Sequence, residues 1–211
     1  MTQLVVFDMD GVLADTESSW TYVHRHFGVN NDHSLRAYLD GEIDDWEFIR
    51  RDIDLWRKKD PALSMDSVRR ILADVPTMNG AEEVVAELRR RGIRTAIVSA
   101  GIDLLAQRLA VELEIDMFFA NGFVADCAGR LTGEGVLNVR LAEKGEKVRM
   151  VADLLDIGRE EVVSVGNSRF DTPMFDASEI GIAFCPIDDE VREKADVVVE
   201  EKDLRAILES V

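Results

Sequence analysis

The feature that most constrains the fold is a regular alternation of helical and strand patterns that begins at Gly80. Apolar residues recur at helical spacing in some segments and form short continuous runs in others. We predict helices over about 81–91, 102–113, 144–155 and 203–208, and strands over 93–98, 162–165, 180–184 and 196–199. This alternation is typical of a parallel sheet with helices on both faces, so we expect a doubly wound α/β fold.

The chain before Gly80 follows a different pattern. Residues 4–7 form a continuous apolar run, which is typical of a strand buried on both faces. Residues 16–75 contain successive amphipathic helical patterns and no strand pattern. We therefore predict an α/β core domain over residues 1–15 and 77–211 and an inserted helical cap domain over residues 16–76.

Two smaller structural expectations follow from local patterns. The aromatic residues of the cap stand at spacings that favour helix packing over a binding site, and they are Trp20, Tyr22, Phe27, Trp46, Phe48 and Trp56. Residues 119–135 are expected to form a short antiparallel hairpin that turns at Ala128-Gly129-Arg130.

The charge and cysteine content argue against several classes of protein. The formal net charge is −17 at pH 7 and the basic residues are scattered, so a nucleic-acid partner is not expected. There is no signal-peptide pattern and no run of about 18 apolar residues, so we predict a soluble, cytoplasmic protein without a membrane partner. Cys127 and Cys185 indicate neither a disulfide nor a zinc site, and we expect both thiols to be buried.

Side chains that bind metals or phosphate follow three predicted strands and begin one predicted helix. They are Asp8 and Asp10, then Ser99 with Ala100 and Gly101, then Lys144, and finally Asn167 and Asp171. Open α/β sheets bind ligands at the carboxyl ends of their strands, so these groups are expected to meet. Hydroxyl and backbone N–H groups bind phosphate oxygens, lysine supplies a positive charge, and carboxylates hold Mg²⁺. Together they predict phosphoryl transfer.

The same motifs resemble the haloacid dehalogenase superfamily of phosphatases, with its D-x-D motif, its Ser or Thr, its Lys and its later acidic loop. Within the superfamily, the chain is similar to the phosphoserine phosphatase group over nearly its whole length. The matching segments are FDMDGVLADTE, VSAG, LTGEG, KGEKV, GIAFCP, REKADVVVE and KDLRAIL. The resemblance implies a Rossmann-like core and a Mg²⁺-dependent phosphomonoesterase. Its substrate would be a small phosphate ester, with phosphoserine among the candidates.

The resemblance also implies roles for individual residues. Asp8 would attack phosphorus to form an aspartyl phosphate, and Asp10 would protonate the leaving group and later deprotonate water. The phosphoryl oxygens would be held by Ser99, the N–H groups of Ala100 or Gly101, and Lys144. The metal would be held by Asp8, the main-chain carbonyl of Asp10, Asn167 and Asp171. Glu17 stands in register with a glutamate that contacts the substrate in the group.

The sequence departs from the group's pattern in two places. Where the group has G-D-G-x-N-D, this chain has G-N-S-R-F-D, so Asn167 would be a neutral ligand and Asp171 would bind the metal directly or through water. The arginine that grips the substrate carboxylate has no clear counterpart. Arg51 is our candidate, with Arg50 and a solvated helix face as the alternatives. Lys147 competes with Lys144 for the phosphate-binding role.

Two other functions use the same residues. A phosphomutase would employ the same aspartate pair while shielding the aspartyl phosphate from water. A phosphate-binding module with weakened catalysis would be consistent with Asn167. The presence of Asp8, Asp10, Ser99, Lys144 and Asp171 together favours the phosphatase. The sequence does not indicate an oligomeric state.

Overall fold

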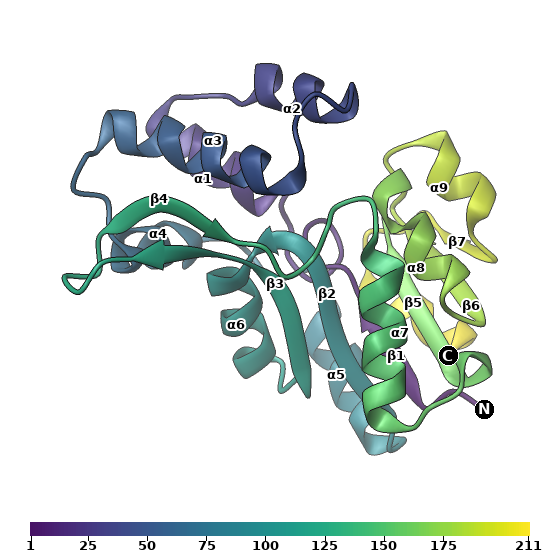
Figure 1. Ribbon diagram of the computed structural model, residues 1–211. Helices are drawn as coiled ribbons and strands as arrows, with labels where there is room; N and C mark the ends of the chain where they lie inside the picture. Colours follow the sequence, from purple (N-terminus) through teal and green to yellow (C-terminus); the bar gives the residue numbers. More distant parts are fainter.

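The computed structural model describes residues 1–211 and contains one seven-stranded sheet with the order β4-β3-β2-β1-β5-β6-β7 (Figure 1). The strands are β1 (Leu4–Phe7), β2 (Arg94–Ile102), β3 (Met117–Ala125), β4 (Leu131–Val136), β5 (Val162–Gly166), β6 (Ile180–Phe184) and β7 (Val197–Val199). All neighbouring strands pair in parallel except β3 and β4, which are antiparallel. The predicted doubly wound parallel sheet is confirmed.

Helices precede, separate and follow these strands. The α-helices are α1 (Ser19–Phe27), α2 (Asp32–Leu39), α3 (Asp45–Lys59), α4 (Met65–Leu72), α5 (Ala81–Arg90), α6 (Asp103–Glu112), α7 (Lys144–Leu155), α8 (Thr172–Asp176) and α9 (Asp189–Lys194). Short 3₁₀ helices are η1 (Arg159–Glu161), η2 (Arg169–Asp171) and η3 (Leu204–Ser210). The predicted helices are confirmed to within one or two residues, except that the last is a 3₁₀ helix. None of the helices is long and apolar enough to cross a membrane.

Alternate residues of the central strand β1 pack on opposite faces of the sheet. Val5 and Phe7 belong to the apolar cluster on the side of α5 and α6, whereas Leu4 and Val6 belong to the cluster on the side of α7 and α8. All four residues are fully buried, because helices cover both faces. The chain leaves this buried layer at Asp8, which places its carboxylate at the carboxyl end of the sheet.

Helices α1 to α4 form the inserted cap. Figure 1 shows α1, α2 and α3 together above the β3–β4 hairpin. α3 packs on β4, and α4 packs on α6. Ile53 and Trp56 of α3 are fully buried in the same apolar cluster as Phe7 and Ile97 of the central strands. The cap and the core therefore share one continuous apolar interior.

The predicted hairpin is present, but β3 is longer than expected. Its first half pairs in parallel with β2 and its second half pairs antiparallel with β4. Sequence analysis missed the part that begins at Met117. A short apolar run next to a hairpin pattern does not reveal that a second strand pairs with it, because that pairing is non-local.

Some expectations about individual side chains need correction. Cys127 is exposed and Cys185 is partly buried, so the two thiols are not core residues. Among the cap aromatics, Trp56 is fully buried, but Trp46 is 46% exposed. Trp20 and Phe48 line a cavity, so the aromatic series is only partly a packing core.

Candidate active site

A cavity of about 460 Å³ lies between the cap helices and the carboxyl ends of β1, β2 and β5. Most of the residues predicted to form a site line it: Asp8, Asp10, Glu17, Ser99, Ala100, Gly101, Lys144 and Asn167. The residues that do not line it are Arg51 and Asp171. The topology thus brings together groups from four distant parts of the chain.

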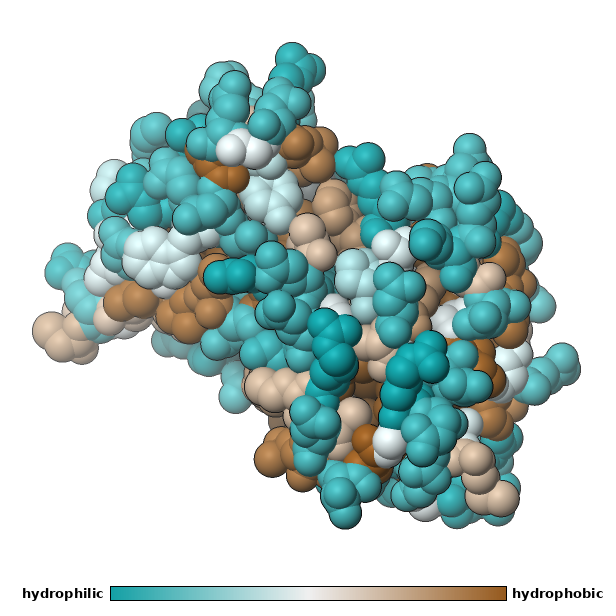
Figure 2. Space-filling model, turned by 45° about the vertical axis from the view of Figure 1, so that its right-hand side comes forward, coloured by the Kyte–Doolittle hydropathy of each residue, from teal (hydrophilic) through white to brown (hydrophobic).

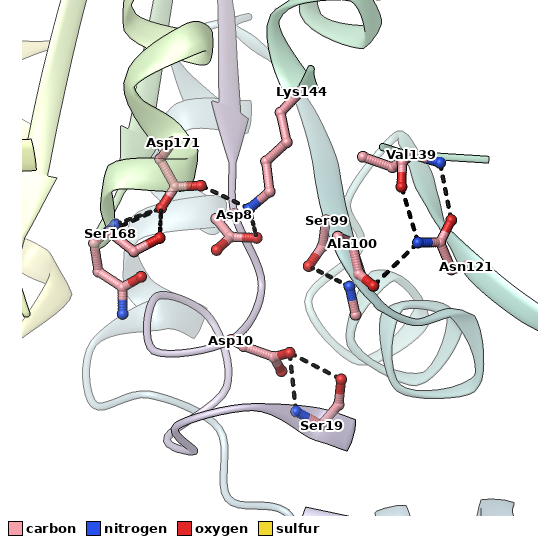
Figure 3. Close-up of polar contacts among 12 residues, drawn as sticks. Asp8, Asp10, Ser19, Ser99, Ala100, Asn121, Val139, Lys144, Ser168 and Asp171 are labelled. Carbon is pink, nitrogen blue, oxygen red and sulfur yellow. Dashed lines mark hydrogen bonds and ion pairs between the residues drawn. The ribbon is translucent and has the colours of Figure 1, made fainter. Parts of the chain in front are cut away.

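Lys144 is the central cation of this site (Figure 3). Its Nζ lies 3.0 Å from Asp8 Oδ1 and 2.6 Å from Asp171 Oδ1, and the lysine is only 3% exposed. Burial, together with the charge of Asp171, raises the pKa of Asp8 to about 7, although Lys144 opposes the shift. Burial disfavours the charged lysine, but the two carboxylates outweigh that effect and raise the pKa of Lys144 above its usual range. The lysine is therefore a fixed positive charge beside Asp8.

Asp171 is fully buried behind Lys144. Its Oδ2 accepts hydrogen bonds from the backbone N–H groups of Asn167 (2.9 Å) and Ser168 (3.0 Å) and from Ser168 Oγ (3.1 Å). Its Oδ1 accepts a hydrogen bond from Lys144. These four donors orient the loop and the lysine. The arrangement leaves no cavity-facing oxygen on Asp171, which departs from the expectation that it ligates a metal directly.

Asp10 is oriented by the start of α1. Its Oδ2 accepts hydrogen bonds from the backbone N–H (2.9 Å) and Oγ (2.8 Å) of Ser19, and Ser19 Oγ in turn accepts one from the N–H of Ile102 (3.0 Å). Burial raises the pKa of Asp10, and the bonds from Ser19 partly oppose this. A carboxyl group with a raised pKa can carry a proton at neutral pH more readily than an exposed one.

The oxygen atoms around Asp8 fit a hard cation such as Mg²⁺. Asp10 Oδ1 is buried and accepts no hydrogen bond, whereas Asp8 Oδ1 is paired with Lys144 Nζ at 3.0 Å. Asn167 lies against the turn at Gly11. A Cβ at Gly11 would lie 2.0 Å from Asn167 Nδ2, and the φ of 78° at this position independently favours glycine. No group of three His, Cys, Asp or Glu side chains is arranged to hold a metal. Such a site would therefore need the Asn167 amide oxygen or a main-chain carbonyl.

The carboxyl-terminal end of β2, which includes Ser99, Ala100 and Gly101, is fixed from both sides. Ser99 Oγ accepts a hydrogen bond from the N–H of Gly101 (3.1 Å). The carbonyl of Ala100 accepts hydrogen bonds from Trp20 Nε1 (3.0 Å) and Asn121 Nδ2 (3.1 Å). The Asn121 side chain also bonds to the backbone of Val139, so it joins β2, β3 and the chain that leads to α7.

Ser19, Trp20 and Asn121 were not among the predicted site residues. Asn121 falls inside a segment that predicts a hairpin, and no local pattern separates it from its neighbours. Ser19 stands at the start of a helix, where serine is common for capping. Their roles depend on contacts between segments 9 to 83 residues apart, which a local pattern does not reveal.

The predicted substrate-binding residues of the cap have different surroundings. Glu17 lines the cavity, but its carboxylate is paired with Arg25 and both side chains are largely exposed. Arg51 donates to Glu47 (2.9 Å), one turn earlier on α3, which holds its guanidinium outside the cavity. Arg50 also pairs with Glu47 and does not line the cavity. Neither arginine is placed to grip a substrate carboxylate.

Comparisons with known proteins agree with this arrangement. The family model described as haloacid dehalogenase-like hydrolase matches residues 5–176. The chain is 33% identical to a phosphoserine phosphatase of Wolinella succinogenes, with 98% of each chain covered. It is 31% identical to that of Methanocaldococcus jannaschii, with 98% of this chain and 96% of the relative covered.

Solved structures give the same result. A substrate-bound phosphoserine phosphatase complex superimposes with a TM-score of 0.85 at 28% identity, and the match covers 100% of this chain and 99% of the other. A phospho-aspartyl intermediate analogue of phosphoserine phosphatase superimposes with a TM-score of 0.83 at 28% identity, with the same coverage.

Proposed function

Because the chain belongs to the haloacid dehalogenase-like hydrolase family, and is a phosphatase of its phosphoserine phosphatase-like group, we propose that it hydrolyses a small phosphate monoester with Mg²⁺ as cofactor. The observation that carries this proposal is the pairing of Asp8 with Lys144 in the cavity at the end of β1. The names of the relatives make O-phosphoserine the first substrate to test.

In the proposed reaction, an Asp8 carboxylate oxygen attacks phosphorus and the bond to the leaving oxygen breaks. Asp10, which Ser19 orients, gives its proton to the leaving alkoxide and later takes one from the water that hydrolyses the aspartyl phosphate. Lys144, Ser99 and the N–H groups of Ala100 and Gly101 would bind the phosphoryl oxygens. Asp8, the Asp10 carbonyl and Asn167 would hold Mg²⁺, which supplies further positive charge at the phosphoryl group when it is bound.

The proposed domain division has residues 1–15 and 77–211 as the catalytic core and residues 16–76 as the cap. Its support is that the chain leaves and re-enters the core at adjacent positions. Ala14 and Thr77 form an isolated antiparallel bridge, and the N–H of Asp15 donates to the carbonyl of Pro76 (2.8 Å). The cytoplasmic location predicted from the sequence stays a prediction, which imaging of a tagged chain would test.

The experiment that tests the function is Asp8→Asn, because an amide is nearly the same shape as a carboxylate but does not attack phosphorus. We expect wild-type protein with Mg²⁺ to release phosphate and to become labelled by a ³²P-phosphate ester after acid quenching. Asp8→Asn should do neither, while its circular dichroism stays that of wild type. Phosphate release by Asp8→Asn near the wild-type rate would overturn the covalent mechanism. Ligand binding by wild type without any phosphate release would favour the binding module.

A further inference from the structure

The cap side of the cavity is lined by carboxylates and by no basic residue. Glu17, Asp45 and Asp52 line it from the cap, whereas the basic residues that line it are Lys144 and Arg169, both from the core. Glu17 is paired with Arg25. Asp45 Oδ1 accepts hydrogen bonds from the N–H of Leu141 (2.8 Å) and the Tyr38 hydroxyl (3.3 Å). Asp52 differs from both.

Asp52 is a buried carboxylate with an unfilled acceptor. It is 3% exposed, and its Oδ2 accepts a hydrogen bond from Asn31 Nδ2 (3.0 Å). The same oxygen lies 3.4 Å from His24 Nε2. Its other oxygen, Oδ1, is buried and has no hydrogen-bond partner. Leaving a buried acceptor of this kind unpaired is costly, so it calls for a donor from outside the protein.

His24 does not supply a positive charge to Asp52. Trp56 Nε1 donates a hydrogen bond of 2.6 Å to His24 Nδ1. An indole nitrogen only donates, so Nδ1 must keep its lone pair and the imidazole proton lies on Nε2. An imidazolium would direct a second N–H at the indole N–H. His24 is therefore neutral in this contact, and Asn31, which donates the hydrogen bond to Asp52, is neutral as well.

We infer that Asp52 is the recognition site for a cationic group of the substrate, which is a phosphate monoester of an amino alcohol. This inference rests on the proposed phosphatase function, since both ends of the substrate occupy one cavity. The substrate's ammonium fills the open acceptor of Asp52 with a charge-assisted hydrogen bond, while its phosphate lies near Asp8, Ser99 and Lys144. Burial raises the pKa of Asp52, and a bound ammonium counteracts that effect.

The cap side of the cavity also disfavours a substrate whose leaving group carries a carboxylate and no ammonium. Such a group would face Asp52 and Asp45 without a cap cation to pair with. O-Phosphoethanolamine carries the ammonium alone, O-phosphoserine carries the ammonium and a carboxylate, and 3-phosphoglycerate carries a carboxylate without an ammonium. We therefore expect kcat/KM for the two amines to exceed that for 3-phosphoglycerate, and O-phosphoethanolamine to be hydrolysed without need of a carboxylate.

The decisive experiment compares two nearly isosteric esters, O-phosphoethanolamine and n-propyl phosphate, in wild type and Asp52→Asn. Their different leaving groups affect both enzymes equally, so the ratio of their kcat/KM values isolates the ammonium contact. We expect Asp52→Asn to lower this ratio by about tenfold to about 100-fold. Asp54→Asn is the matched control, because Asp54 lies on the same helix outside the cavity and should leave the ratio unchanged.

A second measurement needs only wild-type protein. 3-Aminopropylphosphonate should inhibit p-nitrophenyl phosphate hydrolysis about tenfold more strongly than n-butylphosphonate, or more. The reason is that its ammonium makes the same charge-assisted contact with Asp52. Equal inhibition by the two phosphonates would overturn the cation site, and so would an unchanged ratio of the two kcat/KM values in a folded Asp52→Asn. Hydrolysis of p-nitrophenyl phosphate in the same assays would still support the phosphatase function. If wild-type protein did not hydrolyse p-nitrophenyl phosphate, the proposed function itself would be refuted.

Discussion

Lys144 contacts two carboxylates that occupy different positions, since Asp8 lines the cavity and Asp171 does not. Asp171 also accepts three hydrogen bonds from its own loop, so it fixes the lysine relative to β5. The Asp8 carboxylate is the one that a phosphate could reach. In this way a single lysine partly offsets the charge of Asp171 at Asp8 and, in the proposed reaction, would supply positive charge to an incoming phosphoryl group.

Asn167 gives a prediction at the same scale. Replacing it with aspartate adds a negative charge to the proposed metal ligands, and divalent-cation affinity in oxygen sites rises with ligand charge. We therefore expect Asn167→Asp to lower the Mg²⁺ concentration that gives half-maximal phosphatase activity. Titration of activity against Mg²⁺ measures this. Asn30→Asp is the control, because it adds the same charge at an exposed position. An unchanged or raised Mg²⁺ requirement in Asn167→Asp would remove Asn167 from the ligand set.

The sequence predicted which side chains would meet where chemically suitable residues stand at the ends of predicted strands or at the start of a predicted helix, and these side chains line one cavity. Asp8, Ser99 and Lys144 each directly follow or begin a predicted element, so their convergence follows from the sheet topology. The partners that orient the site, such as Asn121, did not emerge from sequence. Nor did Asp52, since its environment depends on His24 and Asn31, which are distant in sequence and meet only when the cap helices pack.

Among the elements, α3 connects the hairpin to the cavity. Ile49 packs on β4 at Gly135, where a Cβ would lie 2.3 Å from the Ile49 Cγ2 atom. The same helix carries Asp45 and Asp52, which line the cavity. The sequence predicted helices over residues 16–75 and, separately, the hairpin. It did not predict that they touch, because glycine on a strand indicates a close approach without identifying the partner.

Gly135→Ala tests that contact. The added methyl group should push α3 away from β4 and lower the free energy of unfolding by about 1–3 kcal/mol. It should also raise KM for the best ester, because α3 carries Asp45 and Asp52 on the cap side of the cavity. Thermal unfolding and steady-state kinetics measure the two effects. Val136→Ala is the control on the neighbouring residue, whose side chain is 40% exposed. Wild-type stability and KM in Gly135→Ala would show that α3 adjusts without consequence for the cavity.

For the molecule as a whole, the net charge of −17 opposes the approach of a phosphate dianion. Figure 2 shows that hydrophilic side chains cover most of one face of the molecule, over both the cap and the core. The cations that line the cavity, Lys144 and Arg169, act locally against this overall field. The dependence of kcat/KM on ionic strength shows whether repulsion by the net charge or attraction by these two cations dominates substrate binding.

We expect kcat/KM for n-propyl phosphate to rise as the ionic strength increases from about 0.01 M to about 0.15 M, because salt screens the long-range repulsion more than the buried contacts. Mg²⁺ should be held constant and saturating. Sodium chloride and potassium chloride should give the same curve if the effect is screening and not specific ion binding. A steady fall in kcat/KM would show that attraction by the cavity cations outweighs the field of the whole protein.

The stacked indoles of Trp20 and Trp56 have a consequence for how the molecule can be observed. Their ring centroids lie 5.5 Å apart. Trp20 donates a hydrogen bond to Ala100 near the end of β2, and Trp56 donates one to His24, which lies beside Asp52. The chain's third tryptophan, Trp46, is 46% exposed. Two of the three tryptophans therefore connect the phosphate end of the cavity to its cap end. The intrinsic tryptophan fluorescence of the protein should therefore report whether both ends of a ligand are bound, without any attached label.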